Sequence, residues 1–171
     1  ADDPGALQIG DLRPALVLGL LSSIGPFAID MYLPAMPEIG AALGTSVQGM
    51  QGTIVAYFIA FGLAQLIYGP WADRSGRKPP LYAGIAVFIV GSLVCTFAPT
   101  VEWLLVGRAI QGLGGAALMV VPRAIIRDLY TGANVARHYS TLIFIVGLSA
   151  VVSPTVATRV LGLTSWRGIF V

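Results

Sequence analysis

The sequence predicts an all-α membrane protein, a bundle of helices that cross a lipid bilayer. Two observations support this prediction: apolar residues make up 56% of the 171 residues, and charged residues make up only 11%. Because a soluble domain carries roughly 25% charged residues, this chain cannot build an ordinary soluble surface. The composition therefore excludes a typical soluble enzyme and a disordered protein. A net charge of +2 is also too small to bind the phosphates of a nucleic acid, so no nucleic-acid partner is expected.

Five continuous apolar stretches have the length of a transmembrane helix, which is about 20 residues. Trp166 and Arg167 have the character of an entry to another helix, so we expect five helices plus the start of a sixth. The polar residues 1–14 are expected to form a cytoplasmic N-terminal segment, and residues 15–171 one transmembrane helical domain. The five predicted spans are residues 15–33, 52–68, 81–97, 101–125 and 140–161.

Basic residues are unevenly distributed over the predicted loops. With the N-terminus inside, seven of the ten lie on the cytoplasmic side and two lie outside, which is the bias that orients membrane proteins. The expected location is thus the bilayer, with a cytoplasmic N-terminus. Pro34 and Pro37 are expected to lie in a short outer loop that ends near Val47. The seven cytoplasmic basic residues are Arg13, Arg74, Arg77, Lys78, Arg123, Arg127 and Arg137.

The segment between the second and third spans, residues 69–81, alternates glycine and charge. Gly69 is expected to let two helices approach closely, and Gly76 to adopt a positive φ in a tight turn. Asp73 can accept hydrogen bonds from helix-end N–H groups or from a basic side chain. The basic residues of the segment are expected to anchor the turn at the anionic membrane surface, and they are Arg74, Arg77 and Lys78.

Two ionisable residues fall inside predicted spans, where a charge costs about 2.5–3.5 kcal/mol and marks a functional candidate. Asp30 lies shortly before the outer end of the first span, and Arg108 lies roughly 10 Å inside the outer end of the fourth. Comparable depths make them a candidate pair for proton coupling, and Gln111 shares the helix face of Arg108. A helix–helix salt bridge without a transport role, and an interfacial Asp30 facing headgroups, are the alternatives.

Small residues predict close helix contacts in the fourth span, at Gly107 and Gly112, while Pro154 is expected to kink the fifth. The glycines after Gln111 also fit a dinucleotide-binding pattern, but no strand precedes them and no acidic residue follows at the required distance. One cysteine and one histidine cannot build a metal site. We therefore expect no metal, no cofactor and no enzymatic activity, and we expect His138 to be solvated in a cytoplasmic loop.

Three motifs together resemble the major facilitator superfamily. Residues 69–78 match all six positions of its G-x-x-x-D-R-x-G-R-K/R loop signature. Residues 108–112 are similar to the R-x-x-Q-G element of proton-coupled members, and residues 30–37 to the D-M-Y-L-P-A-M-P element of drug/proton antiporters of the Bcr/CflA type, which are bicyclomycin- and chloramphenicol-resistance transporters. One element departs from the pattern, because the residues around Pro154 that match a glycine-rich run are Ser153, Ala157 and Thr158.

The resemblance implies the N-terminal half of a bundle of about twelve helices, with a C-terminal half as its partner. It implies proton-coupled efflux of small amphipathic drugs or metabolites across a bacterial inner membrane, with protons and a small-molecule substrate as partners. Asp30, Arg108 and Gln111 would contribute to the proton-coupling site or substrate cavity, and residues 69–78 would form a gating loop. An uptake carrier for a small metabolite and a truncated membrane module that transports nothing are the alternatives.

Overall fold

The structure, a computed structural model, describes residues 12–170 and is helical throughout most of that range. Five of its helices are long and apolar enough to cross a membrane, as the apolar stretches predict. The segment that begins at Trp166 forms a short 3-10 helix, so a sixth span that starts there stays a prediction. The elements are α1 Leu12–Leu43, α2 Val47–Ser75, α3 Lys78–Thr96, α4 Val101–Leu129, α5 Ala133–Leu163 and η2 Trp166–Phe170.

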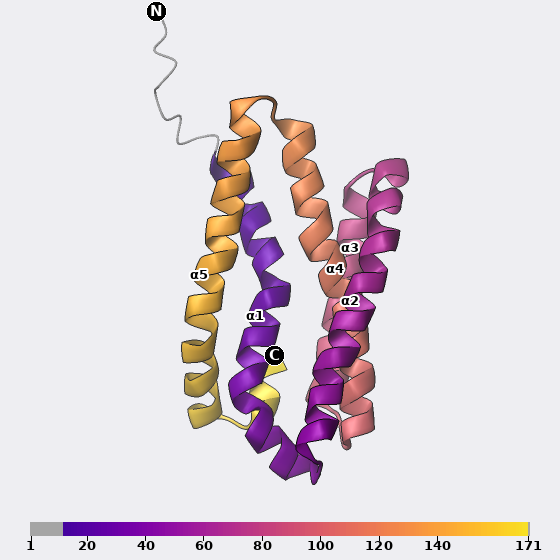
Figure 1. Cartoon of the computed structure of the whole chain (residues 1–171), viewed down its shortest axis with the longest axis vertical. Coiled ribbons are helices and arrows are strands. Elements are labelled where there is room, and N and C mark those ends of the chain that lie inside the picture. The colour runs from indigo at the N-terminus through magenta and orange to yellow at the C-terminus, as the bar shows by residue number, and fades with distance from the viewer. Residues whose placement is uncertain (1–11, 171) are drawn as a thin grey trace, which may run out of the picture.

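The helices form an up-and-down bundle with α4 near its centre. Helix α4 packs against α2 and α3, and α1 packs against α5 and α4 (Figure 1). The α1–α2 and α3–α4 turns lie at one end of the bundle, whereas the start of α1 and the α2–α3 and α4–α5 turns lie at the other (Figure 1). This is the alternation that the distribution of basic residues predicts. Residues 1–11 of the predicted cytoplasmic segment lie outside the described residues.

Helix α1 is longer than expected, and the prediction of an outer loop at Pro34 and Pro37 is wrong. Both prolines lie inside α1, which ends only at Leu43, and the turn to α2 is residues 44–46 with a positive φ at Gly44. A proline removes one backbone hydrogen bond. In a membrane bundle, neighbouring helices and small local adjustments compensate for that loss, so a proline does not have to end the helix.

The α2–α3 connection is also shorter than the predicted loop. Helix α2 continues through Ser75, so only Gly76 and Arg77 lie between the two helices. Gly76 has φ +82°, as expected for the glycine of a tight turn. Gly69 instead lies within α2, and a side chain there would meet no atom within 4 Å. The expectation that Gly69 allows a close helix approach is therefore wrong.

The close approach occurs on α4, at the glycines that the sequence marks there. A Cβ on Gly112 would collide with the backbone of Tyr57 on α2, and one on Gly107 would come within 2.7 Å of the Cys95 sulfur on α3. The α4 span is accordingly the most buried of the five, at 61%, whereas the α5 span is buried to only 17%. Pro154 lies exposed on α5, and its role in helix packing stays a prediction.

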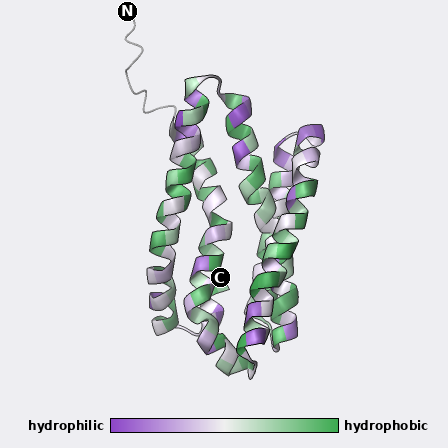
Figure 2. Cartoon of the chain, viewed as in Figure 1, coloured by the Kyte–Doolittle hydropathy of each residue, from purple (hydrophilic) through white to green (hydrophobic). Residues whose placement is uncertain are grey.

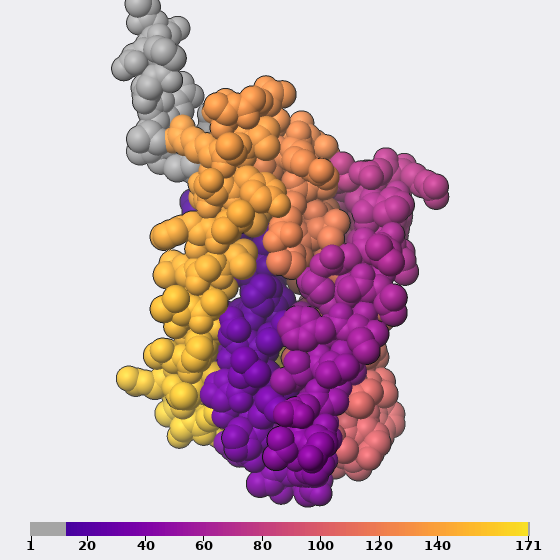
Figure 3. Space-filling view, in the orientation of Figure 1, coloured from indigo at the N-terminus to yellow at the C-terminus, as the bar shows by residue number. Residues whose placement is uncertain are grey.

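The outer surface of the bundle is apolar over much of its length. Hydrophobic residues occupy the middle of the helices, and hydrophilic residues gather at the helix ends near the turns (Figure 2). Large apolar side chains such as Leu66, Phe144 and Val151 are more than two-thirds exposed. In the space-filling view, α1 is recessed between α5 and α2 (Figure 3). This surface suits contact with lipid or with further helices rather than with water.

His138 is buried rather than solvated, which contradicts our expectation. Helix α5 begins at Ala133, earlier than the predicted span, so His138 lies within its second turn. Its ring stacks on Tyr130 with 3.7 Å between centroids. Its Nδ1 donates a hydrogen bond to the Asn134 carbonyl oxygen at 2.9 Å. The extra helical turns bring the imidazole against the end of α4.

Candidate functional site

The candidate site is built around Arg108, on the buried face of α4. Its side chain has no exposed surface, and no carboxylate oxygen of the described residues lies within 4.0 Å of it. A guanidinium group stays charged under all ordinary conditions. A buried charge is costly unless its surroundings compensate it. The groups around Arg108 must therefore supply that compensation.

Two aromatic rings compensate part of the buried charge of Arg108. The Arg108 guanidinium carbon lies 4.4 Å from the ring centroid of Tyr32 on α1 and 4.7 Å from that of Tyr57 on α2. Both distances are within the range of a cation–π interaction, in which the negative face of the ring attracts the cation. Neither tyrosine was predicted from the sequence to belong to the site. In the sequence they are simply tyrosines within two predicted spans, and such residues usually serve in packing. Their contact with Arg108 becomes visible only in the fold.

Gln111 holds a third side of the guanidinium. Arg108 Nη1 donates to Gln111 Oε1 at 2.5 Å, and Gln111 Nε2 donates in turn to Ser92 Oγ on α3 at 2.8 Å. The prediction that Gln111 lies on the helix face of Arg108 is thus correct. The chain of hydrogen bonds fixes the orientation of the Gln111 amide and links α4 to α3.

One edge of the Arg108 guanidinium has no partner. Its Nε and Nη2 donors are buried, and neither makes a hydrogen bond within the described part of the chain. These two donors form the edge that can hold both oxygens of a carboxylate. Buried donors without partners are rare in folded proteins and require an explanation.

Asp30 lies at a depth similar to that of Arg108 but is not paired with it. It is half-buried on α1, two residues before Tyr32, and makes no hydrogen bond or ion pair among residues 12–170. Tyr32 contacts Arg108, and Asp30 is only two residues away on the same helix. Asp30 and Arg108 therefore lie at similar depths in the bundle, as helix rise predicts. Asp30 follows Gly19 by eleven residues, about three helical turns. It therefore shares the face of α1 on which Gly19 meets Ile145 of α5.

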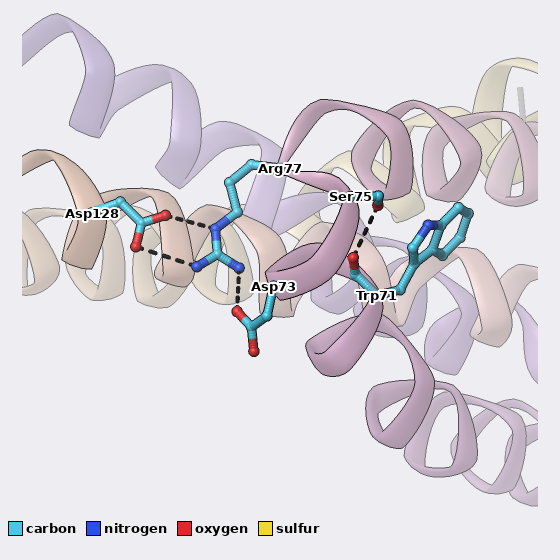
Figure 4. Close-up of polar contacts among 5 residues, drawn as sticks. All are labelled: Trp71, Asp73, Ser75, Arg77 and Asp128. Atoms are coloured by element: carbon cyan, nitrogen blue, oxygen red, sulfur yellow. Dashed lines mark hydrogen bonds and ion pairs between the residues drawn. The ribbon is translucent and has the colours of Figure 1, made fainter.

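A second polar cluster lies at the α2–α3 turn, where Arg77 contacts two carboxylates (Figure 4). Arg77 Nη1 donates to Asp73 Oδ1 at 2.7 Å, while its Nε and Nη2 donate to Asp128 Oδ2 and Oδ1 at 2.6 and 3.2 Å. The hydrogen bonds to Asp128 and then to Asp73 raise the pKa of Arg77 above its ordinary value. Arg77 thereby joins the α2–α3 turn to the last turn of α4.

The other predicted residues of this loop have different positions. Arg74 and Lys78 are exposed, and they take part in neither of the ion pairs found in the described range. Asp128 is part of the cluster, although it was not predicted from the sequence. The sequence could have indicated Asp128, because it is an acidic residue at the predicted cytoplasmic end of a span, on the same side as the basic loop.

An apolar cavity of about 490 Å³ lies between α1, α3, α5 and η2. Phe27, Phe88 and Ile169 are among its lining residues, and Ser92 and Gln111 contribute the polar atoms nearest to Arg108. Neither Asp30 nor Arg108 lines it. The short helix η2 forms one wall of this cavity.

Comparison with known proteins identifies the family. The sequence model of the Major Facilitator Superfamily matches residues 18–171. The chain belongs to the major facilitator superfamily. The two polar clusters described above contain residues of two of the sequence motifs: Asp73 and Arg77 belong to residues 69–78, and Arg108 and Gln111 belong to residues 108–112.

Several curated superfamily proteins are similar to this chain along most of its length. The uncharacterized MFS-type transporter YdgK of Bacillus subtilis is 37% identical over 161 residues, which are 93% of this chain and 40% of that protein. The bicyclomycin resistance protein homolog of Haemophilus influenzae is 34% identical, covering 91% and 39%. The chloramphenicol resistance protein of Pseudomonas aeruginosa is 36% identical, covering 88% and 36%. The chain thus spans about two fifths of the length of these superfamily relatives.

Proposed function

We propose that this chain forms the N-terminal part of a proton-coupled exporter of small amphipathic drugs. The observation that carries the proposal is Arg108, a fully buried cation with an open donor edge, at the depth of the ionisable Asp30. The names of the relatives, which refer to bicyclomycin, chloramphenicol and multidrug resistance, support drugs as the substrate class. The exporter would lie in a bacterial inner membrane with a cytoplasmic N-terminus, and it would require a C-terminal half.

The proposed mechanism depends on the charge of Asp30. From the outward-open state Asp30 takes a proton, and in the inward-open state it releases the proton to the cytoplasm. Because Asp30 lies on the face of α1 toward α5 in this structure, an ionised Asp30 would favour an arrangement of α1 and α4 that brings it to the open Nε–Nη2 edge of Arg108, and a protonated Asp30 would favour that arrangement much less. The two charge states therefore favour different arrangements of α1 and α4, and this difference in free energy can couple proton movement to export. Gln111 keeps the guanidinium oriented while Asp30 changes charge.

The first prediction concerns Asp30→Asn in the full-length transporter. The amide cannot release a proton at physiological pH, so the variant should insert normally but lose export driven by a pH gradient. The measurement is drug transport in proteoliposomes at several imposed pH gradients. Glu38→Gln is the matched control, because Glu38 is an exposed carboxylate on the same helix that accepts a hydrogen bond from the Trp166 backbone N–H.

Two outcomes would contradict this proposal. Normal export by Asp30→Asn over the whole range of pH would make Asp30 a structural residue. Gradient-driven accumulation of a metabolite without drug export would instead favour an uptake carrier, which is the alternative within the same superfamily.

A further inference from the structure

An apolar groove lies at the end of the bundle that carries the α3–α4 turn. It has a volume of about 450 Å³ and is lined by five residues of α3, α4 and the turn between them. Their side chains are predominantly apolar, so the groove suits a hydrocarbon chain rather than water. The lining residues are Leu93, Val94, Phe97, Pro99 and Trp103.

The groove lies on a face of α3 that is turned away from α4. Cys95 marks the face that contacts α4, because a Cβ on Gly107 would come within 2.7 Å of its sulfur. Leu93 and Phe97 are one turn apart on a different face, and they are 50% and 76% exposed. Trp103, in the first turn of α4, is 56% exposed, and a tryptophan at the end of a span is typical of the membrane interface. Because α3 and α4 are both long and apolar enough to cross a membrane, the medium at this groove is lipid.

A cation is fixed beside the groove. Arg167 of η2 donates from Nη2 to the Ala98 carbonyl oxygen at 3.3 Å, and its guanidinium carbon lies 4.3 Å from the ring centroid of Trp166. Ala98 is the residue between Phe97 and Pro99, which both line the groove. The hydrogen bond and the ring therefore hold the charge of Arg167 next to the turn that forms one end of the groove.

Arg167 retains donors for a further partner. Its side chain is exposed, and it takes part in neither ion pair of residues 12–170. The nearby acidic residues Glu38 and Glu102 form no ion pair with it. Guanidinium donors bind phosphate oxygens in pairs, so an arginine beside a hydrocarbon groove matches the two parts of a phospholipid.

We propose that this groove and Arg167 form a phospholipid site, in which one acyl chain lies between Leu93 and Trp103 and the phosphate contacts Arg167. A lipid bound in this way contacts α3, α4 and η2 at once and stabilises their arrangement at this end of the bundle. The site is separate from Asp30 and Arg108, and it does not depend on the proposed export function.

The test measures lipid contact at Trp103 directly, by fluorescence quenching with phospholipids that carry bromine atoms on their acyl chains. The full-length transporter keeps Trp103 as its only tryptophan, and Trp166→Phe retains an aromatic ring beside Arg167. The vesicles mix brominated phosphatidylglycerol with an unbrominated digalactosyl lipid, which has the same acyl chains but no phosphate. Quenching should exceed the value expected from the mole fraction of the brominated lipid, because the groove prefers the lipid that carries a phosphate.

Removing the charge should remove most of this preference. Arg167→Gln can still donate to the Ala98 carbonyl oxygen, but it should lower the preference for phosphatidylglycerol by about fivefold, the effect of one basic residue at an anionic lipid surface. Arg167→Lys should retain most of the preference. Arg159→Gln is the matched control, because Arg159 is an exposed arginine near the end of α5 that does not line the groove.

A preference that Arg167→Gln removes and that Arg167→Lys and Arg159→Gln keep supports the site. Quenching that follows the mole fraction in the parent protein would overturn it, since the groove would then hold any lipid equally. An equal loss in Arg167→Gln and Arg159→Gln would also overturn it, because general surface charge would account for the preference. A loss in Arg167→Lys as large as in Arg167→Gln would exclude a phosphate held by the charge of residue 167.

Discussion

Arg77 and Arg108 present the same edge of the guanidinium group to different surroundings. In Arg77 the Nε and Nη2 donors hold both oxygens of Asp128, and the side chain is 22% exposed at the end of the bundle. In Arg108 the same two donors have no partner among the described residues, and the side chain is fully buried. The paired edge suits a structural connection, whereas the open edge can bind a group whose charge changes.

The second prediction, also at the residue scale, compares two glycines. Gly112→Ala should destabilise the bundle by about 1–3 kcal/mol, because the added methyl group collides with the Tyr57 backbone. Gly69→Ala should be neutral or stabilising by up to about 1 kcal/mol, since the site has open space and alanine favours helix. Unfolding of the two variants in detergent, followed by tryptophan fluorescence, measures both. Equal stability of the two would contradict the close contact of α2 and α4.

At the scale of elements, the Arg77 cluster connects three helices at one end of the bundle. Asp73 lies in the last turn of α2, Arg77 immediately precedes α3, and Asp128 lies in the last turn of α4 (Figure 4). Asp73 and Asp128 are 66% and 51% exposed. Solvent therefore screens the pairs, and each contributes little to stability. The geometry suggests a role in gating, because the ion pairs would break if these helix ends separated.

The third prediction tests that role with Asp73→Asn in the full-length transporter. Loss of the carboxylate should weaken the hold of Arg77 on α2 and slow transport several-fold, while the amount of inserted protein stays nearly unchanged. Arg74→Gln is the control, since Arg74 is exposed and takes part in neither ion pair of the described region. Transport and membrane insertion are measured in the same vesicles. A parental rate for Asp73→Asn would exclude a gating role.

At the scale of the whole molecule, the five helices are buried to different extents. Helix α4 is enclosed by α1, α2 and α3, whereas the exposed face of α5 and the cavity beside η2 have no protein partner among the described residues. The Glu38 carboxylate accepts the Trp166 N–H, and Arg167 donates to the Ala98 carbonyl oxygen, so η2 is held against α1 and the α3–α4 turn. These two hydrogen bonds fix the position of η2 beside the apolar cavity that it lines.

The fourth prediction is that the 171-residue chain alone does not export drugs. It spans about two fifths of the length of its relatives, and alternating access requires two bundles that move against each other around a site. Proteoliposomes containing the chain and a pH-sensitive dye should show no drug-dependent proton movement. Such movement by the isolated chain would contradict the role assigned to a C-terminal half.

Much of the fold could be predicted because membrane insertion depends on local composition. The five spans, the alternation of their ends and the close contacts at Gly107 and Gly112 follow from apolar length, basic residues and small side chains. Helix ends were less predictable. Pro34 and Pro37 resemble loop residues in sequence, and only packing by neighbouring helices keeps them within α1.

The sequence by itself determined that the chain is a helical membrane protein, and it marked Asp30 and Arg108 because charge inside an apolar span is costly. Only the tertiary structure decided their surroundings. Tyr32 and Tyr57 are 25 residues apart on different helices, yet both contact Arg108. Arg77 and Asp128 are 51 residues apart, yet they form an ion pair. Such contacts depend on how the helices rotate and pack. Periodicity and spacing could therefore identify the buried arginine but not the two rings that hold it.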